Sequence, residues 1–248
     1  MKKVYYLWLR QIKKYLRSRS RMLGSFFQPL LYLVAMGYGF GSVFSQAGQG
    51  SYLDFLAPGV IGMSIIFTSM FSGMEVLWDR QFGFLKETLV APMPRFNIML
   101  GRTLGSATVA TLQGVIVMLM SFILVTHLMG WLSILQAIGV MFLIATLFTS
   151  LSTMIASLLK DMQGFQAIMN FLIMPLFMLS GSLFPLQGLP DLLSLVTRID
   201  PLSYGIDALR ALFINTSQFG LITDVSVLGA TTLLFLWLGG HFFKKIQV

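Results

Sequence analysis

The sequence predicts an all-α integral membrane protein. We expect six transmembrane helices, an N-terminal amphipathic helix at the membrane interface, and short extracellular re-entrant helices before the last span. Three observations support this fold: few charges, six long apolar stretches, and basic residues confined to alternate joints. Of the 248 residues, 56% are hydrophobic and 10% are charged, whereas soluble domains carry roughly 25% charged residues.

The apolar stretches set the number of crossings. A helix needs about 20 apolar residues to cross the hydrocarbon core of a bilayer. Six stretches are long enough, and they run over residues 22–44, 55–74, 103–126, 131–159, 163–184 and 225–243. No internal repeat or soluble domain separates them, so a single transmembrane domain is expected over residues 1–248.

The basic residues predict the orientation. All but two of the 17 Lys and Arg residues lie in the leading segment, in the joint 78–102, beside Asp161, or in the tail. Arg198 and Arg210 are the exceptions, and they lie among several aspartates. Cytoplasmic joints of membrane proteins carry the excess of basic residues. The pattern therefore places both termini in the cytoplasm of a multi-pass protein of the cell membrane.

Composition argues against several classes of function. The net charge is +8, but the charges flank apolar spans and form no basic face with interleaved aromatics, so anionic lipid is a better partner than nucleic acid. The chain has no cysteine, and His127 and His241 are its only histidines. No metal site or redox chemistry is indicated.

Residues 1–21 predict a separate element. Tyr5, Trp8 and Ile12 fall on one helical face, whereas Arg10 and Lys13 lie away from it. This pattern is typical of an amphipathic helix that lies in the cytoplasmic interface. A cleaved signal peptide is the alternative, but the basic region is too long and the apolar one spans the bilayer. Farther on, Gly101 and Gly105 have the small-xxx-small spacing that favours close helix packing.

The joint 78–95 is predicted to be a cytoplasmic coupling segment. It mixes charges with an amphipathic helical pattern around Phe84 and Leu85, and Pro92 and Pro94 end any helix there. A plain connection needs only a handful of residues. This segment is long enough to dock a partner, although it could instead lie on the membrane surface. Near its start, Glu75 is expected to form a structural ion pair with Arg80 or Arg102.

The segment 185–219 is predicted to be extracellular and re-entrant. Prolines interrupt it, yet it is too apolar for a free loop. Short helices that dip into the outer leaflet fit this composition. They would form an outer gate, with Pro185, Pro201, Tyr204 and Arg210 as candidate residues, or a structural plug without a gating role.

Residues 173–210 resemble the signature of the ABC-2 family of ATP-binding-cassette transporter permeases. The match rests on Ile173, Leu176, Leu179, Ser180, Ser182, the pair Leu189-Pro190, the run Pro201-Leu202-Ser203-Tyr204, and Arg210. The joint 78–95 also resembles the coupling segment of drug-exporting members, with Asp79, Arg80, Gly83, Glu87 and Pro92 in place. It departs at Gln81, where an acidic residue is common.

The resemblance implies a homodimer, or a pseudodimer with a related chain. Each six-helix subunit would dock on a separate ATP-binding cassette subunit, which would bind ATP and Mg²⁺. No cofactor and no catalytic site are then expected in this chain. The sequence agrees on one point, because it contains no Gly-Lys dipeptide and hence no P-loop.

The resemblance also suggests that the second and fifth spans line a transport pathway. Candidate lining residues are Phe67, Met70, Phe71, Met74, Asn170, Phe171, Met174 and Phe177. Met and Phe adapt to many shapes, which favours efflux of a drug-like or lipid-like molecule, as in multidrug resistance. Export of a glycolipid or polysaccharide is the alternative, and a membrane scaffold or intramembrane enzyme is a more distant one. Each lining candidate could also serve ordinary helix packing.

Overall fold

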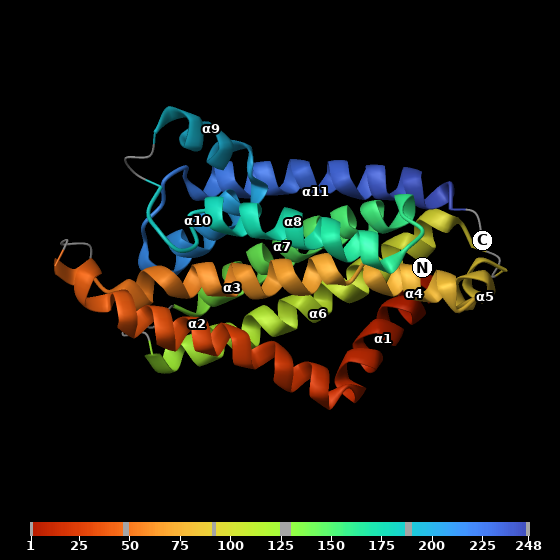
Figure 1. Ribbon diagram of the computed structural model, residues 1–248, viewed down its shortest axis with the longest axis horizontal. Coiled ribbons are helices and arrows are strands. Elements are labelled where there is room, and N and C mark those ends of the chain that lie inside the picture. The colour runs from red at the N-terminus through yellow and green to blue at the C-terminus, as the bar shows by residue number, and fades with distance from the viewer. Residues whose placement is uncertain (1, 47–49, 91–92, 125–129, 187–189, 247–248) are drawn as a thin grey trace.

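The computed structural model describes residues 2–46, 50–90, 93–124, 130–186 and 190–246. These residues contain α-helices and no strand. The helices, shown in Figure 1, are α1 (Lys2–Arg17), α2 (Arg19–Gln46), α3 (Tyr52–Phe71), α4 (Met74–Gln81), α5 (Phe84–Val90), α6 (Arg95–Leu124), α7 (Trp131–Leu158), α8 (Met162–Leu179), α9 (Asp191–Ile199), α10 (Pro201–Ile214) and α11 (Leu221–Lys244).

Six candidate spans confirm the predicted number of crossings. They are Phe27–Gln46, Tyr52–Gln81, Arg95–Leu124, Trp131–Leu158, Met162–Leu179 and Leu221–Lys244. Two boundaries differ most from the prediction: the second span continues through α4, and the third begins at Arg95 rather than at residue 103. The charged residues Asp79 and Arg102 pair with each other, so both helices continue through positions that the sequence pattern assigned to a polar joint.

The bundle is built around α3 and α7. Helix α3 packs against α2, α6, α7 and α10, whereas α7 packs against α6, α10 and α11. Ile61, Ile65 and Ile66 of α3 are fully buried. Few residues of α8 and α11 are fully buried within the subunit. Figure 1 shows the spans running side by side, with the start of α1 and the end of α11 at one end of the bundle. We call this the terminal end and the opposite one the far end.

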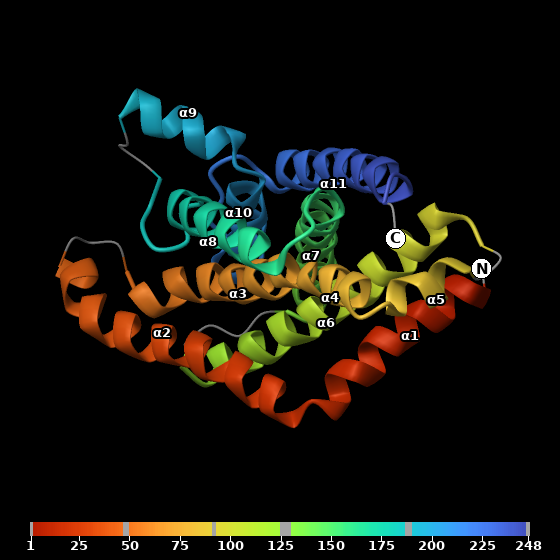
Figure 2. The same ribbon diagram turned by 45° about the vertical axis from the view of Figure 1, so that its right-hand side comes forward.

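Helix α1 packs along the first half of α6. A Cβ at Gly101 would lie 3.0 Å from Leu7 Cβ, and one at Gly105 would lie 2.8 Å from Gln11 Cβ, so only glycine permits this close approach. Trp8 Nε1 donates a hydrogen bond to Thr108 Oγ1 at 2.9 Å. Figure 2 shows α1 meeting α2 at an elbow. The helix is as predicted, whereas its place in the membrane interface stays a prediction.

Two short helices precede the last span, as the sequence predicts. Asp200 caps α10 by accepting a hydrogen bond from the Leu202 N–H at 2.8 Å, and Pro201 occupies the first turn. Helix α10 is buried against α3, α7 and α11. Helix α9 instead exposes Leu192, Leu195 and Ile199. Whether this segment enters the outer leaflet stays a prediction.

Candidate functional site

The predicted coupling segment folds into the end of α4, a turn, and α5. Gly83 has a φ of +80°, a conformation that glycine adopts without strain. This residue lets α5 turn away from α4. Within α5, the Thr88 hydroxyl donates to the Phe84 carbonyl at 3.1 Å. The described part of the segment is therefore ordered helix joined by one tight turn.

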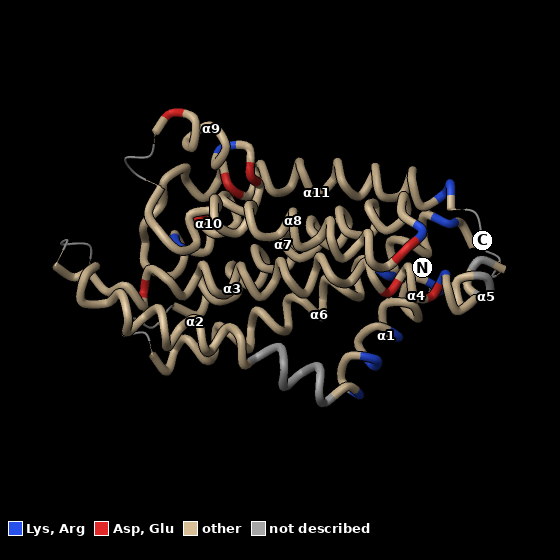
Figure 3. The backbone as a smooth tube through the Cα atoms, viewed as in Figure 1, with Lys and Arg blue, Asp and Glu red and all other residues tan. Residues whose placement is uncertain are grey.

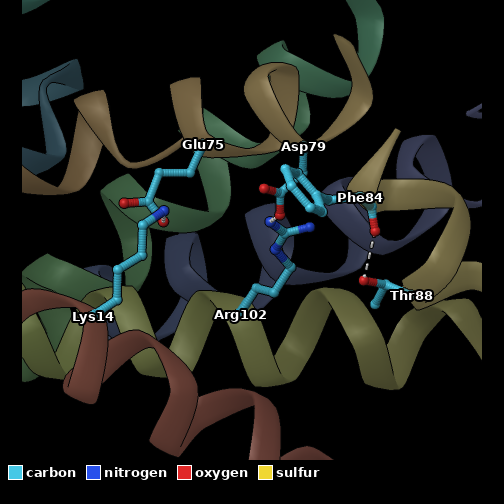
Figure 4. A network of polar contacts seen from close by, with 6 residues as sticks. All are labelled: Lys14, Glu75, Asp79, Phe84, Thr88 and Arg102. Atoms are coloured by element: carbon cyan, nitrogen blue, oxygen red, sulfur yellow. Dashed lines mark hydrogen bonds and ion pairs between the residues drawn. The ribbon is translucent and has the colours of Figure 1, made fainter. Parts of the chain in front are cut away.

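Charged residues gather at the terminal end and again at the far end (Figure 3). At the terminal end, Arg102 of α6 forms an ion pair with Asp79 of α4, and both side chains are buried. A second pair joins Lys14 Nζ of α1 to Glu75 Oε2 of α4 at 3.3 Å. Figure 4 shows the two pairs one turn apart along α4. Helix α4 is thus tied to both α1 and α6.

These contacts add partners to the expected ion pairing. Glu75 forms an ion pair with Lys14, a partner that the sequence did not suggest. Arg102 forms an ion pair with Asp79, and Arg80 Nη1 donates a hydrogen bond to the carbonyl oxygen of Leu159 at 3.2 Å. The sequence alone missed Lys14 as a partner because α1 reaches α4 only through its packing on α6. Asp79 and Arg80 therefore hold the coupling segment to neighbouring helices.

Helix α5 and the turn before it expose apolar residues at the terminal end. Leu85 is fully buried, but Phe82, Phe84 and Val90 are 70%, 51% and 84% exposed. The side chain of Glu87 and the residue Pro92, both predicted to act in coupling, lie outside the described residues. The exposed surface of α5 is suited to contact a partner on that side of the bundle.

The predicted lining residues divide into two sets. On α8, Asn170, Phe171 and Met174 are exposed, and so is Gln166 one turn before Asn170. Phe177 of α8 and Met70 of α3 are instead buried within the subunit. The remaining candidates Phe67, Phe71 and Met74 are half-buried against the core. One continuous face of α8 therefore carries the exposed members.

The predicted gate residues all lie at the far end, but only two of them line the same cavity. Tyr204 Oη donates to the Arg198 carbonyl at 2.8 Å, and its ring lies 4.8 Å from that of Phe219. Pro185 and Arg210 both line a cavity of about 490 Å³. Pro201 serves as the first residue of α10. The cavity also includes Asp54 and Phe55, which sequence reasoning missed, although adjacent charged and aromatic residues at a span end were the available signal.

Comparison with known proteins places the chain in a family. Residues 2–214 match the model of the ABC-2 type transporter family. The transport permease ycf38 of Cyanophora paradoxa is 29% identical over 81% of this chain and 70% of its own length. Nodulation protein J of Rhizobium leguminosarum bv. trifolii is 30% identical over 79% of this chain and 75% of its own length. The chain therefore belongs to the ABC-2 type transporter family, whose members are transport permeases.

Proposed function

We propose that this chain is the permease subunit of an exporter that moves a hydrophobic or amphipathic molecule out of the cytoplasm or the inner leaflet. ATP hydrolysis in a separate subunit drives the movement. The chain acts as a homodimer in the cell membrane, with both termini in the cytoplasm. The family supports the transport role. The exposed face of α8 is the main observation in favour of a pathway along this helix.

The α8 face supports a dimer with a central pathway. Gln166 and Asn170 are amides within an apolar span, and both are exposed in the single subunit. Amides facing hydrocarbon are costly, so residues of this kind face other protein or a water-filled cavity. A second copy placed against α8 would provide contacting protein and would enclose a cavity between the two subunits. Phe171 and Met174 on the same face supply an adaptable apolar lining.

The terminal end supports a coupling role for α4 and α5. The exposed α5 surface would dock on the ATP-binding subunit. Motion of α5 would pass to α4, then through the Asp79–Arg102 pair to α6 and through the Glu75–Lys14 pair to α1. The buried pair provides a stiff link between helices, because separating it would leave an uncompensated buried charge.

Cysteine cross-linking tests the dimer. The chain lacks cysteine, so Phe171→Cys or Met174→Cys introduces a single reactive thiol on the α8 face. We expect a cross-linked dimer from these variants in native membranes. Leu233→Cys on α11 is the matched control, because this side chain is also exposed, at 69%. Equal cross-linking from the control, or none from α8, would refute the proposed axis.

ATPase measurements test coupling. The permease is co-expressed with its ATP-binding subunit, and ATPase activity is measured in lipid across hydrophobic drugs, lipids and glycolipids. We expect Phe84→Asp to lose cargo-stimulated activity, because a charge would disrupt the apolar docking surface. Leu158→Asp, at the same end but on α7, is the control and should retain stimulation. Normal stimulation in Phe84→Asp would contradict docking through α5.

A glycolipid or polysaccharide is the second candidate cargo. It is favoured by the far-end cavity, whose lining includes hydroxyl and carboxylate groups such as Ser51, Ser217 and Asp54. The apolar α8 face favours a drug-like or lipid-like molecule. Stimulation by glycolipids alone in the same ATPase experiment would select the second candidate.

A further inference from the structure

Helix α1 presents two different strips of side chains away from the bundle. Leu7 and Gln11 contact the glycine pair of α6, which defines the packed side of the helix. Tyr15, one turn farther on, is also buried. The other described side chains of α1 are exposed or half-buried. They divide by chemistry into a basic strip and an apolar strip.

The basic strip consists of Arg10, Lys13 and Arg17. These positions are three and four residues apart, so their side chains share one side of the helix, where like charges repel each other. All three are exposed, and among the described residues none forms an ion pair or a hydrogen bond with them. Helix α1 contains no Asp or Glu, and Figure 3 shows basic residues spaced along it. The strip is therefore a row of positive charges that an anionic partner would stabilise.

The apolar strip runs along the helix beside the basic strip. Its members recur at helical spacing and are Tyr5, Leu9, Ile12 and Leu16. Tyr5 and Leu16 are 54% and 56% exposed. A bilayer surface offers acyl chains and headgroups side by side, so a helix that lies in it satisfies an apolar and a basic strip together.

The place of α1 in the chain favours the same surroundings. Arg17 lies ten residues before Phe27, where the first candidate span begins, which corresponds to about 15 Å of helix. The basic strip therefore ends close to the level at which that span leaves the membrane. An acidic surface on a partner protein would also attract the strip, but it would leave the apolar strip facing water.

We propose that the basic strip binds the phosphate groups of anionic phospholipids in the cytoplasmic leaflet. The apolar strip inserts among the acyl chains beside them. The two arginines can donate paired hydrogen bonds to phosphate oxygens, and Lys13 adds a point charge. Lys14, next to the strip, holds Glu75 of α4, so bound lipid also steadies the helix to which α4 is tied. This inference goes beyond the proposed export function and does not depend on it.

The lipid selectivity of the full-length chain, without any ATP-binding subunit, tests the strip independently of transport. The chain is reconstituted in phosphatidylcholine bilayers that contain a trace of spin-labelled phosphatidylglycerol or spin-labelled phosphatidylcholine. Electron spin resonance then gives the fraction of each probe held at the protein. We expect a preference for phosphatidylglycerol that weakens as NaCl is raised, because salt screens exposed charges. Equal association of the two probes at low salt would refute the proposal.

A triple variant locates the binding on α1. Arg10→Gln/Lys13→Gln/Arg17→Gln should lose most of the preference, since a basic residue beside an anionic leaflet strengthens the attraction roughly fivefold. The matched control is Lys160→Gln/Lys244→Gln/Lys245→Gln, which also removes three exposed charges and should keep most of the preference. An equal loss in both triple variants would overturn the assignment to α1.

Two further results bear on the same strip. Lys13→Glu reverses a single exposed charge on the side away from α6, so it tests the proposal even if the triple variant does not fold. We expect it to weaken the preference, and an unchanged preference would refute the strip. A triple variant that keeps the lipid preference but no longer assembles with the ATP-binding subunit would make the strip a protein docking surface instead.

Discussion

The two ends of the bundle treat their charged residues differently. At the terminal end, charges from separate helices neutralise each other: Asp79 meets Arg102, and Glu75 meets Lys14. At the far end, Asp207 is satisfied by N–H and hydroxyl donors, and Arg210 by a carbonyl and a ring. The first arrangement ties helices together. The second surrounds a cavity.

This difference follows from what each end does in the proposed mechanism. Transmission of motion from α5 needs links that hold α4 to its neighbours, and direct ion pairs between helices supply them. At the far end, the same kinds of charged group instead hold α10 and the residues after it in place around the cavity.

Breaking the buried pair at the terminal end should have the largest effect. Arg102→Leu leaves Asp79 buried without its partner, and such changes cost about 3–5 kcal/mol. We expect a marked loss of thermal stability and of membrane-inserted protein. The double variant Asp79→Leu/Arg102→Leu should recover most of the stability, because both charges are then absent. A stable Arg102→Leu protein would show that the pair is not a structural link.

Removing the acceptor at the far end should cost less. Asp207→Ala deprives the N–H groups of Gln218 and Phe219 of their shared partner. Hydrogen bonds to a charged group contribute about 1.5–3 kcal/mol each, but water can replace part of this in an exposed loop. We expect a net loss of about 2 kcal/mol and faster proteolysis at residues 215–218. Asp207→Asn retains one acceptor oxygen, so its stability should lie between that of Asp207→Ala and that of the unmodified protein.

The pH dependence of stability should distinguish the far end from the terminal end. Burial raises the pKa of Asp200 to about 7, whereas in the unfolded chain it lies near its usual value of about 3.9. Between these values the folded protein holds a proton that the unfolded chain has released. Stability therefore falls as pH rises from about 4 to 7 and stays low above 7.

A melting experiment checks this dependence. Each kcal/mol recovered raises Tm by roughly 2–4 °C in a chain of this size. We expect a higher Tm at pH 5 than at pH 8. Asp200→Asn should raise Tm at pH 8 and remove most of the difference, since asparagine is also a good N-cap. An unchanged pH profile in this variant would assign the effect to another group.

The less buried pair at the terminal end should have the smallest effect. Lys14 is 49% exposed and Glu75 14% exposed, and surface ion pairs contribute roughly 0–1 kcal/mol. Lys14→Ala should therefore change Tm by no more than a few degrees, and Glu75→Gln should retain most transport. Near-complete loss of transport in folded Glu75→Gln protein would give this residue a direct role in the pathway.

Periodicity and charge predicted the elements well. The six spans, the helix before the first span and the short helices before the last one all depend on local apolar length and on breakers such as Pro190 and Pro201, which the sequence displays directly. Span ends were predicted less well. Asp79 and Arg102 read as members of a polar joint, yet their mutual pairing keeps both within regular helix.

For the candidate site, the sequence offers residue types more readily than their arrangement. The amides of α8 and the coupling segment were recognisable because polar or mixed-charge residues are unusual at those positions in an apolar chain. The buried orientation of Met70 and Phe177 could not be recognised from the sequence. Every face of a membrane helix is apolar, so periodicity carries little information about which face is buried. Only contacts between helices separate an exposed side chain from a packed one there.

The sequence by itself determined the class of the protein, the number of its crossings, the positions of its short helices and its family. These properties follow from local composition, because burial of apolar length and the placement of basic residues act on each segment separately. The tertiary structure decided that Lys14 pairs with Glu75, that Asp79 pairs with Arg102, and that Arg210 stacks on Phe55 beside a cavity. Each of these contacts joins residues far apart in the chain, and only the packing of helices across glycines such as Gly101 and Gly105 brings distant segments so close.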